Sequence, residues 1–450
     1  MRRVLFLLAF LAVPLCAQDT TAIDKAVTDV LAKTGAPSAS IAVVRDGKIA
    51  YQHAYGNARL APPLPATTDM RYSIGSISKQ FTAAAILMLA QEGKLSLDDK
   101  LVRWLPELTR SNDVTVREIL SMTSGYQDFW PQDYVMPRML QPVTAQEIMD
   151  EWARKPLDFE PGTKWQYSNT NYVIAGAIVE KISGMPLLDF LQQHIFGPLH
   201  MTSVYNTDQS PLGPDEPQRY LRYALGPLRP APKEGKGWMF AAGELAMTAH
   251  DLALWDISII DQAVLRPESY KAMETEVRLA NGAGSHYGLG LTVGMSDGRH
   301  YVMHGGEVSG FTATNVVYPE LRSAIVVQTN QDATPASGEI ASKIATILFS
   351  TTNEPALAEV KKIFDNLQHG RIDRFLFSPN ANAYFSEPAI HDFAASLAPL
   401  GKPEAFTQES EGLRGGMTLR RYSIRFPKKT LRLTTFWLPD NKLEQYQLAE

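Results

Sequence analysis

The segment from Ser76 to about Glu92 constrains the fold of this chain most strongly, because its pattern is helical and apolar on nearly every face. The apolar positions are Phe81, Ala83, Ile86, Leu87 and Leu89. A helix without a polar face has to be surrounded by protein. Gly93 follows, and glycine is common just past a helix C-terminus. The sequence therefore predicts a buried helix that begins at a serine.

Strand patterns lie on both sides of this helix in the sequence. Residues 38–44 and 48–55 read as two strands joined at Asp46-Gly47, a strong hairpin signal. Four further strands are expected at 289–293, 300–304, 312–318 and 323–328. Helical stretches fill much of the chain between the two groups. This order predicts an α/β (α+β) fold, with one mixed, mainly antiparallel sheet flanked by helices and with a helical lobe inserted.

The chain divides into segments of different character. We predict a signal peptide at 1–17, a main domain at 18–350 and a small α+β accessory domain at 355–450. The accessory domain is predicted from helical patterns at 356–367 and 389–397, followed by short alternating strands from 419 to 448. The longest loop, 209–237, contains six prolines. We expect it on the surface beside the active-site cleft, because long loops in compact domains are often functional.

The N-terminal segment has the composition of a secretory signal. Two arginines precede the apolar run Val4–Leu15, and small residues near Ala17 offer a cleavage site. The run has about 12 residues, too few for a bilayer, which takes roughly 20. We therefore expect export to the periplasm or beyond the cell, with no stable membrane insertion after cleavage. Lipid anchoring through Cys16 is the alternative, although the leucine before it is larger than such sites usually carry.

Composition excludes several classes of function. The net charge of −5 is small and the basic residues are scattered, which argues against a nucleic-acid partner. Cys16 is the only cysteine, so a chain cleaved after it has no disulfide and no thiol chemistry. His300 and His304 share a strand face, but no carboxylate or thiol follows at ligand spacing. We predict no metal and no cofactor.

The first chemical element is Ser76 with Lys79 three residues later. Residues at i and i+3 share a helix face, so the lysine ammonium can reach the serine oxygen. Backbone N–H groups at a helix start stabilise negative charge that develops on that oxygen. Burial should lower the pKa of Lys79 toward the range of a working base. A serine N-cap followed by a lysine that extends its amine to solvent fits the same pattern.

The second element is a loop that carries Tyr167 and Asn169, shortly after Pro161-Gly162. A phenol and an amide two residues apart can enter the same cleft. With a cation nearby, Tyr167 could hold a lowered pKa and pass protons to and from the serine oxygen and the leaving group. Asn169 could bind a substrate amide and fix the lysine. An ordinary aromatic turn is the competing interpretation.

The third element is His304-Gly305-Gly306 at the end of a predicted strand, followed by Glu307. Paired glycines let another backbone or a substrate approach a strand edge closely. An N–H group just after them would serve as the second donor of an oxyanion hole, with the Ser76 N–H as the first. A tight turn between two strands would also account for the glycines.

Together, the three elements resemble the serine β-lactamase and penicillin-binding protein superfamily. That superfamily carries Ser-x-x-Lys at a helix start, a Tyr-x-Asn loop, and Lys-Thr-Gly or His-x-Gly on a strand. The chain is most similar to the class C β-lactamase branch and its related esterases, D-aminopeptidases and DD-carboxypeptidases. Further landmarks of the resemblance are the sequences at 41–48, 93–99, 123–125 and 287–290. The resemblance implies a β-lactamase/transpeptidase-like fold for the main domain.

The resemblance also implies roles for the residues. Ser76 would be the nucleophile, Lys79 its activating partner and Tyr167 the general base, while Asn169 orients the substrate. The N–H groups of Ser76 and Glu307 would form the oxyanion hole. No cofactor is implied.

Two positions depart from the superfamily pattern. His304 stands where the β-lactamases keep a lysine, and an imidazole is largely neutral at pH 7. The site thus lacks a fixed positive charge that would hold a β-lactam or peptide carboxylate. Met122 precedes Thr123-Ser124-Gly125 where many relatives have histidine, which leaves the role of that loop open.

These features predict an exported serine hydrolase that forms an acyl-enzyme on Ser76. The expected substrate is an ester, an amide or a D-amino-acid peptide, either a small molecule or a short peptide, with the cell wall as one source. The alternatives are a true β-lactamase or DD-carboxypeptidase, and a penicillin-binding sensor that is acylated without turnover.

Overall fold

The structure is a computed structural model that describes residues 17–132, 134–296, 298–349 and 354–450, the residues to which the structural statements below refer. These residues form two compact units, one ending at Leu348 and one comprising Phe349–Glu450. The predicted signal peptide up to Cys16 lies outside the described residues, as do residues 351–353 between the helical patterns of the two units.

A seven-stranded sheet forms the centre of the first unit, and its strands lie in the order β3-β2-β1-β12-β11-β10-β9. Neighbouring strands pair antiparallel throughout. The bounds are Ser38–Arg45 for β1, Lys48–Leu60 for β2, Pro63–Pro65 for β3, Thr292–Ser296 for β9, Arg299–Val308 for β10, Phe311–Tyr318 for β11 and Ser323–Thr329 for β12. Asp46 and Gly47 join β1 to β2 with φ of 53° and 75°, values that a tight hairpin turn requires.

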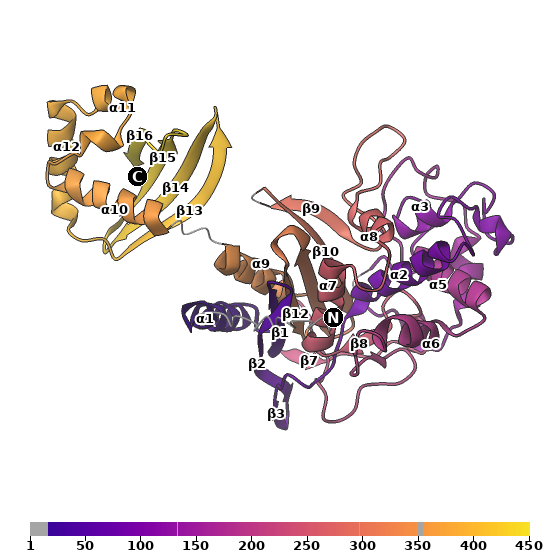
Figure 1. The fold of residues 1–450 in the computed structure, drawn as a ribbon. Coiled ribbons are helices and arrows are strands. Elements are labelled where there is room, and N and C mark those ends of the chain that lie inside the picture. The colour runs from indigo at the N-terminus through magenta and orange to yellow at the C-terminus, as the bar shows by residue number, and fades with distance from the viewer. Residues whose placement is uncertain (1–16, 133, 297, 350–353) are drawn as a thin grey trace, which may run out of the picture. The chain divides into compact units, whose positions relative to one another are not determined.

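The two ends of the unit meet in this sheet. Strand β1 pairs with β12, so that Val43 lies opposite Ile325, and both strands are almost entirely buried. Helices α1 (Ala17–Thr34) and α9 (Ala336–Phe349) lie together on one side of the sheet, joined by an ion pair between Lys33 and Glu339 at 3.0 Å (Figure 1). The predicted sheet with helical flanks is confirmed.

Helix α2 (Ser78–Gln91) lies in the helical lobe that is inserted between the two groups of strands (Figure 1). Its residues from Ser78 to Leu89 are all buried, as its apolar pattern predicts. The other helices of this unit are α3 (Val116–Leu120), α4 (Ala145–Ile148), α5 (Asn169–Ser183), α6 (Leu187–Leu191), α7 (Ala249–Asp261) and α8 (Pro267–Glu274). Helix α5 packs against α2, and α7 covers the lobe side of the sheet against β1, β11 and β12.

The helix does not begin at Ser76. Residues Gly75–Ile77 form a 3₁₀ turn, η1, and α2 follows from Ser78. Gly75 has a φ of 51°, which bends the chain sharply just before the serine. The N-cap of α2 is Ile77 and no side chain caps it. The alternative in which the serine is only a helix cap is therefore not what the structure shows.

Short strands complete the first unit. They are β4 (Tyr72–Ser73), β5 (Tyr205–Asn206) and β8 (Leu245–Met247) in one small sheet, and β6 (Tyr220–Arg222) and β7 (Leu228–Pro230) in a second. Strands β6 and β7 lie within residues 209–237, which we call the proline-rich loop. This loop was expected without strands of its own.

The second unit is a four-stranded antiparallel sheet with helices on it (Figure 1). Its elements are α10 (Glu354–Gln368), α11 (Pro379–Tyr384), α12 (Glu387–Leu397), β13 (Ala405–Arg414), β14 (Met417–Phe426), β15 (Lys429–Trp437) and β16 (Leu443–Ala449). Its core is formed by Phe364, Tyr422, Leu433 and Tyr446, among others. None of the helices in the described ranges of either unit has both the length and the apolar character needed to cross a bilayer.

Candidate active site

Ser76 and Lys79 lie within hydrogen-bonding distance at the start of α2. The Lys79 Nζ atom is 2.9 Å from Ser76 Oγ. The lysine side chain is fully buried, and this burial lowers its pKa to about 7, although the charge of Asp128 acts in the opposite direction. The expected lowering of the lysine pKa is confirmed. At neutral pH a large share of Lys79 is therefore uncharged.

The three neighbours of the Lys79 amine fit both of its protonation states. Asn169 Oδ1, at 2.8 Å, and the carbonyl oxygen of Ala242, at 2.7 Å, can only accept hydrogen bonds from Nζ. A charged ammonium has a third N–H for the Ser76 oxygen. A neutral amine keeps two N–H groups for the two carbonyl oxygens and directs its lone pair at the serine hydroxyl. The neutral state can therefore accept the proton of Ser76.

Asn169 connects the lysine to a carboxylate that the sequence analysis missed. Its Nδ2 atom donates to Asp128 Oδ1 and Oδ2 at 3.2 and 3.3 Å, and its backbone N–H donates to Oδ1 at 2.9 Å. Because the Asp128 carboxylate accepts from Nδ2 and Lys79 donates to Oδ1 in both of its protonation states, these contacts fix the orientation of the Asn169 amide. Asp128 and Ala242 belong to no pattern of spacing, so nothing in the sequence marks them.

Tyr167 faces the same site, but its pKa is shifted in the direction opposite to that expected. Burial raises the pKa of this phenol, the charge of Asp128 raises it further, and only the nearby Ser76 hydroxyl lowers it. The Lys79 Nζ atom lies 5.0 Å from the centre of the Tyr167 ring. The expected lowering is wrong because burial disfavours the phenolate more than the Ser76 hydroxyl favours it. Tyr167 thus stays protonated and can donate a hydrogen bond.

Met122 lies beneath the loop that carries Tyr167. Its sulfur is 3.4 Å from the backbone nitrogen of Ser168 and 3.6 Å from Asn171 Nδ2, and the residue is fully buried. Where many relatives have a histidine, this chain has a side chain that packs under the loop and accepts only weak hydrogen bonds.

His304 is held in its neutral form. Its Nε2 atom lies 2.9 Å from the hydroxyl of Tyr287, and its Nδ1 atom lies 2.5 Å from the carbonyl oxygen of Gly305. Since a carbonyl only accepts, Nδ1 carries the proton and Nε2 accepts from the phenol. Burial, together with the charge of Lys79, lowers the pKa of His304 to about 4. The imidazole therefore supplies no positive charge at neutral pH, in line with its expected role.

The backbone of β10 touches the η1 turn at the predicted oxyanion donors. A Cβ atom on Gly306 would lie 1.8 Å from the carbonyl oxygen of Ile74 and 3.3 Å from the nitrogen of Ser76. A Cβ atom on Gly75 would lie 2.8 Å from the nitrogen of Glu307. The approach is possible only because neither glycine has a side chain. The nitrogens of Ser76 and Glu307 thus lie on adjoining segments.

We expect Gly306→Ala to lower both stability and activity. The added methyl group would force β10 away from η1 and misalign at least one backbone donor, which costs about 10²-fold to 10³-fold in turnover. Thermal unfolding and kcat/KM on a p-nitrophenyl ester measure the two effects. A Cβ on Gly305 meets nothing within 4 Å, so Gly305→Ala should keep the melting temperature of the wild type. A Gly306→Ala protein with unchanged stability and turnover would show that this contact is unimportant.

A cavity of about 980 Å³ opens onto these groups. Ser76, Tyr167, Asn169 and the predicted residues His304, Gly305, Gly306 and Glu307 all line it. Phe129, Trp130 and Trp238 form part of its wall, although Phe129 and Trp238 are almost fully buried. Tyr126 is also buried and donates its hydroxyl to the carbonyl oxygen of Thr109. Leu221 and Pro232 bring the proline-rich loop to the rim, as expected from its length. The volume suits a small molecule or a short peptide.

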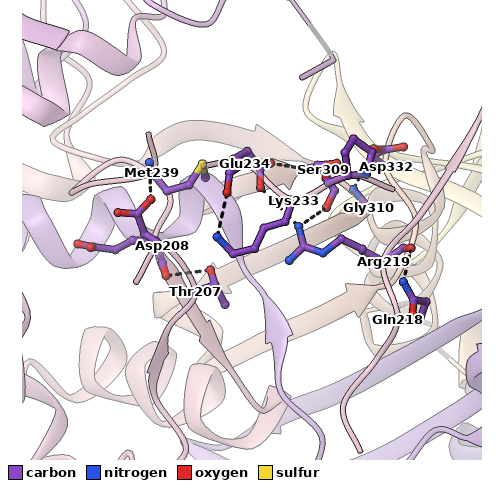
Figure 2. A network of polar contacts seen from close by, with 12 residues as sticks. Thr207, Asp208, Gln218, Arg219, Lys233, Glu234, Met239, Ser309, Gly310 and Asp332 are labelled. Atoms are coloured by element: carbon purple, nitrogen blue, oxygen red, sulfur yellow. Dashed lines mark hydrogen bonds and ion pairs between the residues drawn. The ribbon is translucent and has the colours of Figure 1, made fainter. Parts of the chain in front are cut away.

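Charged side chains connect the proline-rich loop to the turn after β10 (Figure 2). Glu234 Oε1 accepts from the backbone nitrogen of Ser309 at 2.7 Å, and Arg219 Nη1 lies 3.5 Å from Glu234 Oε2. Asp332 Oδ2 accepts from the backbone nitrogen of Gly310 at 2.8 Å. Carboxylates that accept backbone N–H groups make strong, well-directed hydrogen bonds. The network therefore holds the end of the strand that carries His304 to Glu307.

A family model described as Beta-lactamase matches residues 23–347 of the chain. The chain belongs to the beta-lactamase family. The match covers the first unit, including Ser76, Lys79, Tyr167 and His304, and ends before the second unit. The resemblance inferred from the three short motifs is thereby confirmed.

Curated relatives in this family include penicillin-binding and D-amino acid proteins. Penicillin-binding protein 4* of Bacillus subtilis is 29% identical over 313 residues, 65% of this chain and 68% of its own length. A D-aminopeptidase of Brucella anthropi is 28% identical over 341 residues, 74% of this chain and 64% of its own length. The chain thus spans about two thirds of the length of these relatives.

Solved structures show the same fold. A D-amino acid amidase from Ochrobactrum anthropi SV3 has a TM-score of 0.65 at 25% identity and covers 75% of this chain and 100% of its own. An octameric penicillin-binding protein homologue from Pyrococcus abyssi has a TM-score of 0.65 at 21% identity and covers 96% of this chain and 100% of its own. The chain therefore has the fold of the beta-lactamase and penicillin-binding protein family, in which serine hydrolases act on amides and peptides.

Proposed function

We propose that this protein is an exported serine hydrolase that forms an acyl-enzyme on Ser76 and releases it to water. One observation carries the proposal: the buried Lys79 amine, with a pKa of about 7, lies 2.9 Å from the Ser76 hydroxyl. A base whose pKa matches the working pH suits proton transfer in the transition state. Residues whose pKa is strongly shifted by burial cluster at functional sites, which supports the proposal.

The proposed reaction begins when neutral Lys79 takes the hydroxyl proton of Ser76 while Oγ attacks the substrate carbonyl. The backbone N–H groups of Ser76 and Glu307 stabilise the oxyanion. Protonated Tyr167 donates to the leaving group and is reprotonated from Lys79. Water then attacks the acyl-enzyme and gives a proton to neutral Lys79. Lys79 passes this proton to the Ser76 oxygen as the acid product leaves, which restores the enzyme.

The substrate class we favour is an ester, an amide or a D-amino-acid peptide. A neutral His304 leaves the strand edge without the fixed cation that would hold a carboxylate of a β-lactam or a peptide C-terminus. Relatives named D-aminopeptidase and D-amino acid amidase support an amide of a D-amino acid. The proposal of export rests on the sequence of residues 1–17 alone.

Pre-steady-state kinetics with a p-nitrophenyl ester and a fluorescent penicillin tests this function. We expect a burst of p-nitrophenol equal to the enzyme concentration, followed by steady turnover, since acylation and deacylation are separate steps. We expect the penicillin to react slowly or not at all. Stoichiometric labelling by the penicillin without ester turnover would instead identify a penicillin-binding sensor, and fast penicillin turnover would identify a true β-lactamase.

A further inference from the structure

Asp128 is a carboxylate that is held in place at the active site and has unused capacity for hydrogen bonds. Its Oδ1 atom accepts from the backbone nitrogens of Trp130, at 3.1 Å, and Asn169, at 2.9 Å, and from Asn169 Nδ2 at 3.2 Å. Its Oδ2 atom has one contact, with Asn169 Nδ2 at 3.3 Å. A carboxylate oxygen has two lone pairs. Oδ2 can therefore accept from a further donor.

Asp128 lies in the same site as the reacting groups, so a substrate bound there can donate a hydrogen bond to Oδ2. Asp128 lines the same cavity as Ser76, and Asn169 bridges it to Lys79, which in turn bonds the serine. Burial raises the pKa of Asp128, while the donors from Trp130 and Asn169 and the charge of Lys79 lower it in turn. These donors hold the carboxylate in one orientation before any substrate binds.

The charge of the cavity favours a cation. Among the described residues that line it, four carry a carboxylate and one carries a permanent positive charge: Asp128, Glu307, Asp332, Glu339 and Arg222. The other three carboxylates have separate tasks, because they bind Ala333 N, Gly310 N and the Lys33 amine. A cavity lined mostly by one sign of charge attracts ligands of the opposite sign.

We propose that Asp128 binds the α-ammonium group of an amino acid amide or ester whose carbonyl is attacked by Ser76. An α-ammonium is separated from the carbonyl carbon by a single carbon, so a substrate positioned at Ser76 places its ammonium close to the reacting atoms, in the cavity that Asn169 and Asp128 also line. Asp128 then accepts a charge-assisted hydrogen bond on Oδ2. The enzyme would recognise a free N-terminus and not a C-terminal carboxylate. This inference rests on the proposed function and names its substrate class.

The test compares two substrates that differ in one group: alanine p-nitroanilide, with an α-ammonium, and lactate p-nitroanilide, with an α-hydroxyl, each in D and L form. We expect the wild type to prefer the alanine substrate by at least tenfold in kcat/KM. In Asp128→Asn the ratio of kcat/KM for alanine over lactate should be at least tenfold lower than in the wild type. The ratio cancels the shift that the variant causes in the pKa of Lys79, because both substrates need the same base. Glu339→Gln removes the same charge from the cavity lining without touching Asn169, and it should keep the ratio.

The pH dependence separates ammonium binding from a merely structural role of Asp128. The preference of the wild type should decline as pH rises through about 8, where an α-amino group loses its charge, and no such decline should remain in Asp128→Asn. Fluorophosphonate labelling of Ser76 is measured on the same samples. Failure to label Ser76 would overturn the proposed function itself. If Ser76 is labelled but Asp128→Asn keeps the wild-type ratio of kcat/KM for the two anilides, only the role of Asp128 is overturned. The same holds if Ser76 is labelled but neither anilide is hydrolysed.

Discussion

Ser76→Ala should abolish turnover of esters and amides, with a fall in kcat of at least about 10⁴-fold. The substitution removes the only atom that the proposed reaction acylates, and the remaining groups can at best position water. The fold should not suffer, because Ser76 lies in a 3₁₀ turn and its hydroxyl caps no helix. Steady-state hydrolysis of a p-nitrophenyl ester measures the effect.

Thermal unfolding of Ser76→Ala provides the control for this first prediction. We expect a melting temperature within a few degrees of the wild type, since a small side chain is replaced by one that fits the same space. Residual turnover within tenfold of the wild type, in a folded variant, would show that another residue carries the acyl group.

Lys79→Arg should lower kcat by about 10²-fold to 10⁴-fold, the usual contribution of a general base. An arginine can still donate to Asn169 Oδ1 and the Ala242 carbonyl, but it does not lose its proton in proteins. The variant thus keeps a positive charge and hydrogen-bond donors at position 79 but has no group there that can accept a proton. Lys79→Met, which removes both, should be equally inactive. Since an arginine is larger than the buried lysine, thermal unfolding of both variants accompanies the kinetics.

The pH dependence of wild-type activity tests whether Lys79 is the base. The pKa of Lys79 is lowered to about 7, so the amine is charged below this pH and cannot accept a proton. Activity should therefore rise with pH through about 7 and then level off. Tyr167→Phe should lower kcat without moving this inflection, because the phenol keeps its proton across the range. An inflection that disappears in Tyr167→Phe would assign the base to Tyr167.

The sequence could identify members of the candidate site where the residues follow a local spacing. Ser76 and Lys79 are three residues apart, and His304 to Glu307 follow each other on one strand, so each group could be recognised without a structure. Asp128 could not be found in this way. Its contact with Asn169 joins a loop to the start of α5, 41 positions later, and a single carboxylate in a loop has no periodicity.

The direction of the Tyr167 pKa shift depends on a balance that the sequence does not contain. A lysine nearby was expected to lower it, yet the same burial that removes the charge of Lys79 also penalises a phenolate. Whether a buried cation is present can be judged only once the burial of both groups is known.

The fold was likewise predictable for some strands and not for others. Strands β1, β11 and β12 were predicted to within one residue of their bounds, because they are buried along nearly their whole length and rich in β-branched residues. The strand predicted at 289–293 begins only at Thr292, the strands predicted to end at 304 and 55 continue to Val308 and Leu60, and β3 was not predicted. Strand β13 was missed, since most of its residues are exposed and it carries charged and polar side chains along an edge of the sheet. An edge strand that is largely exposed needs no alternation of apolar and polar residues. Strand β13 is therefore recognised only by its pairing with β14.

The most direct test of the account is the rate at which a fluorophosphonate labels the protein between pH 5.5 and 8.5, followed by intact mass and peptide mapping. The reagent does not titrate in this range, so the rate reports the base that activates the serine. We predict a single adduct on the peptide that contains Ser76, absent from Ser76→Ala, with a rate that rises through about pH 7. An adduct on another residue, or a rate on Ser76 that does not change near pH 7, would contradict the claim that neutral Lys79 activates the Ser76 hydroxyl.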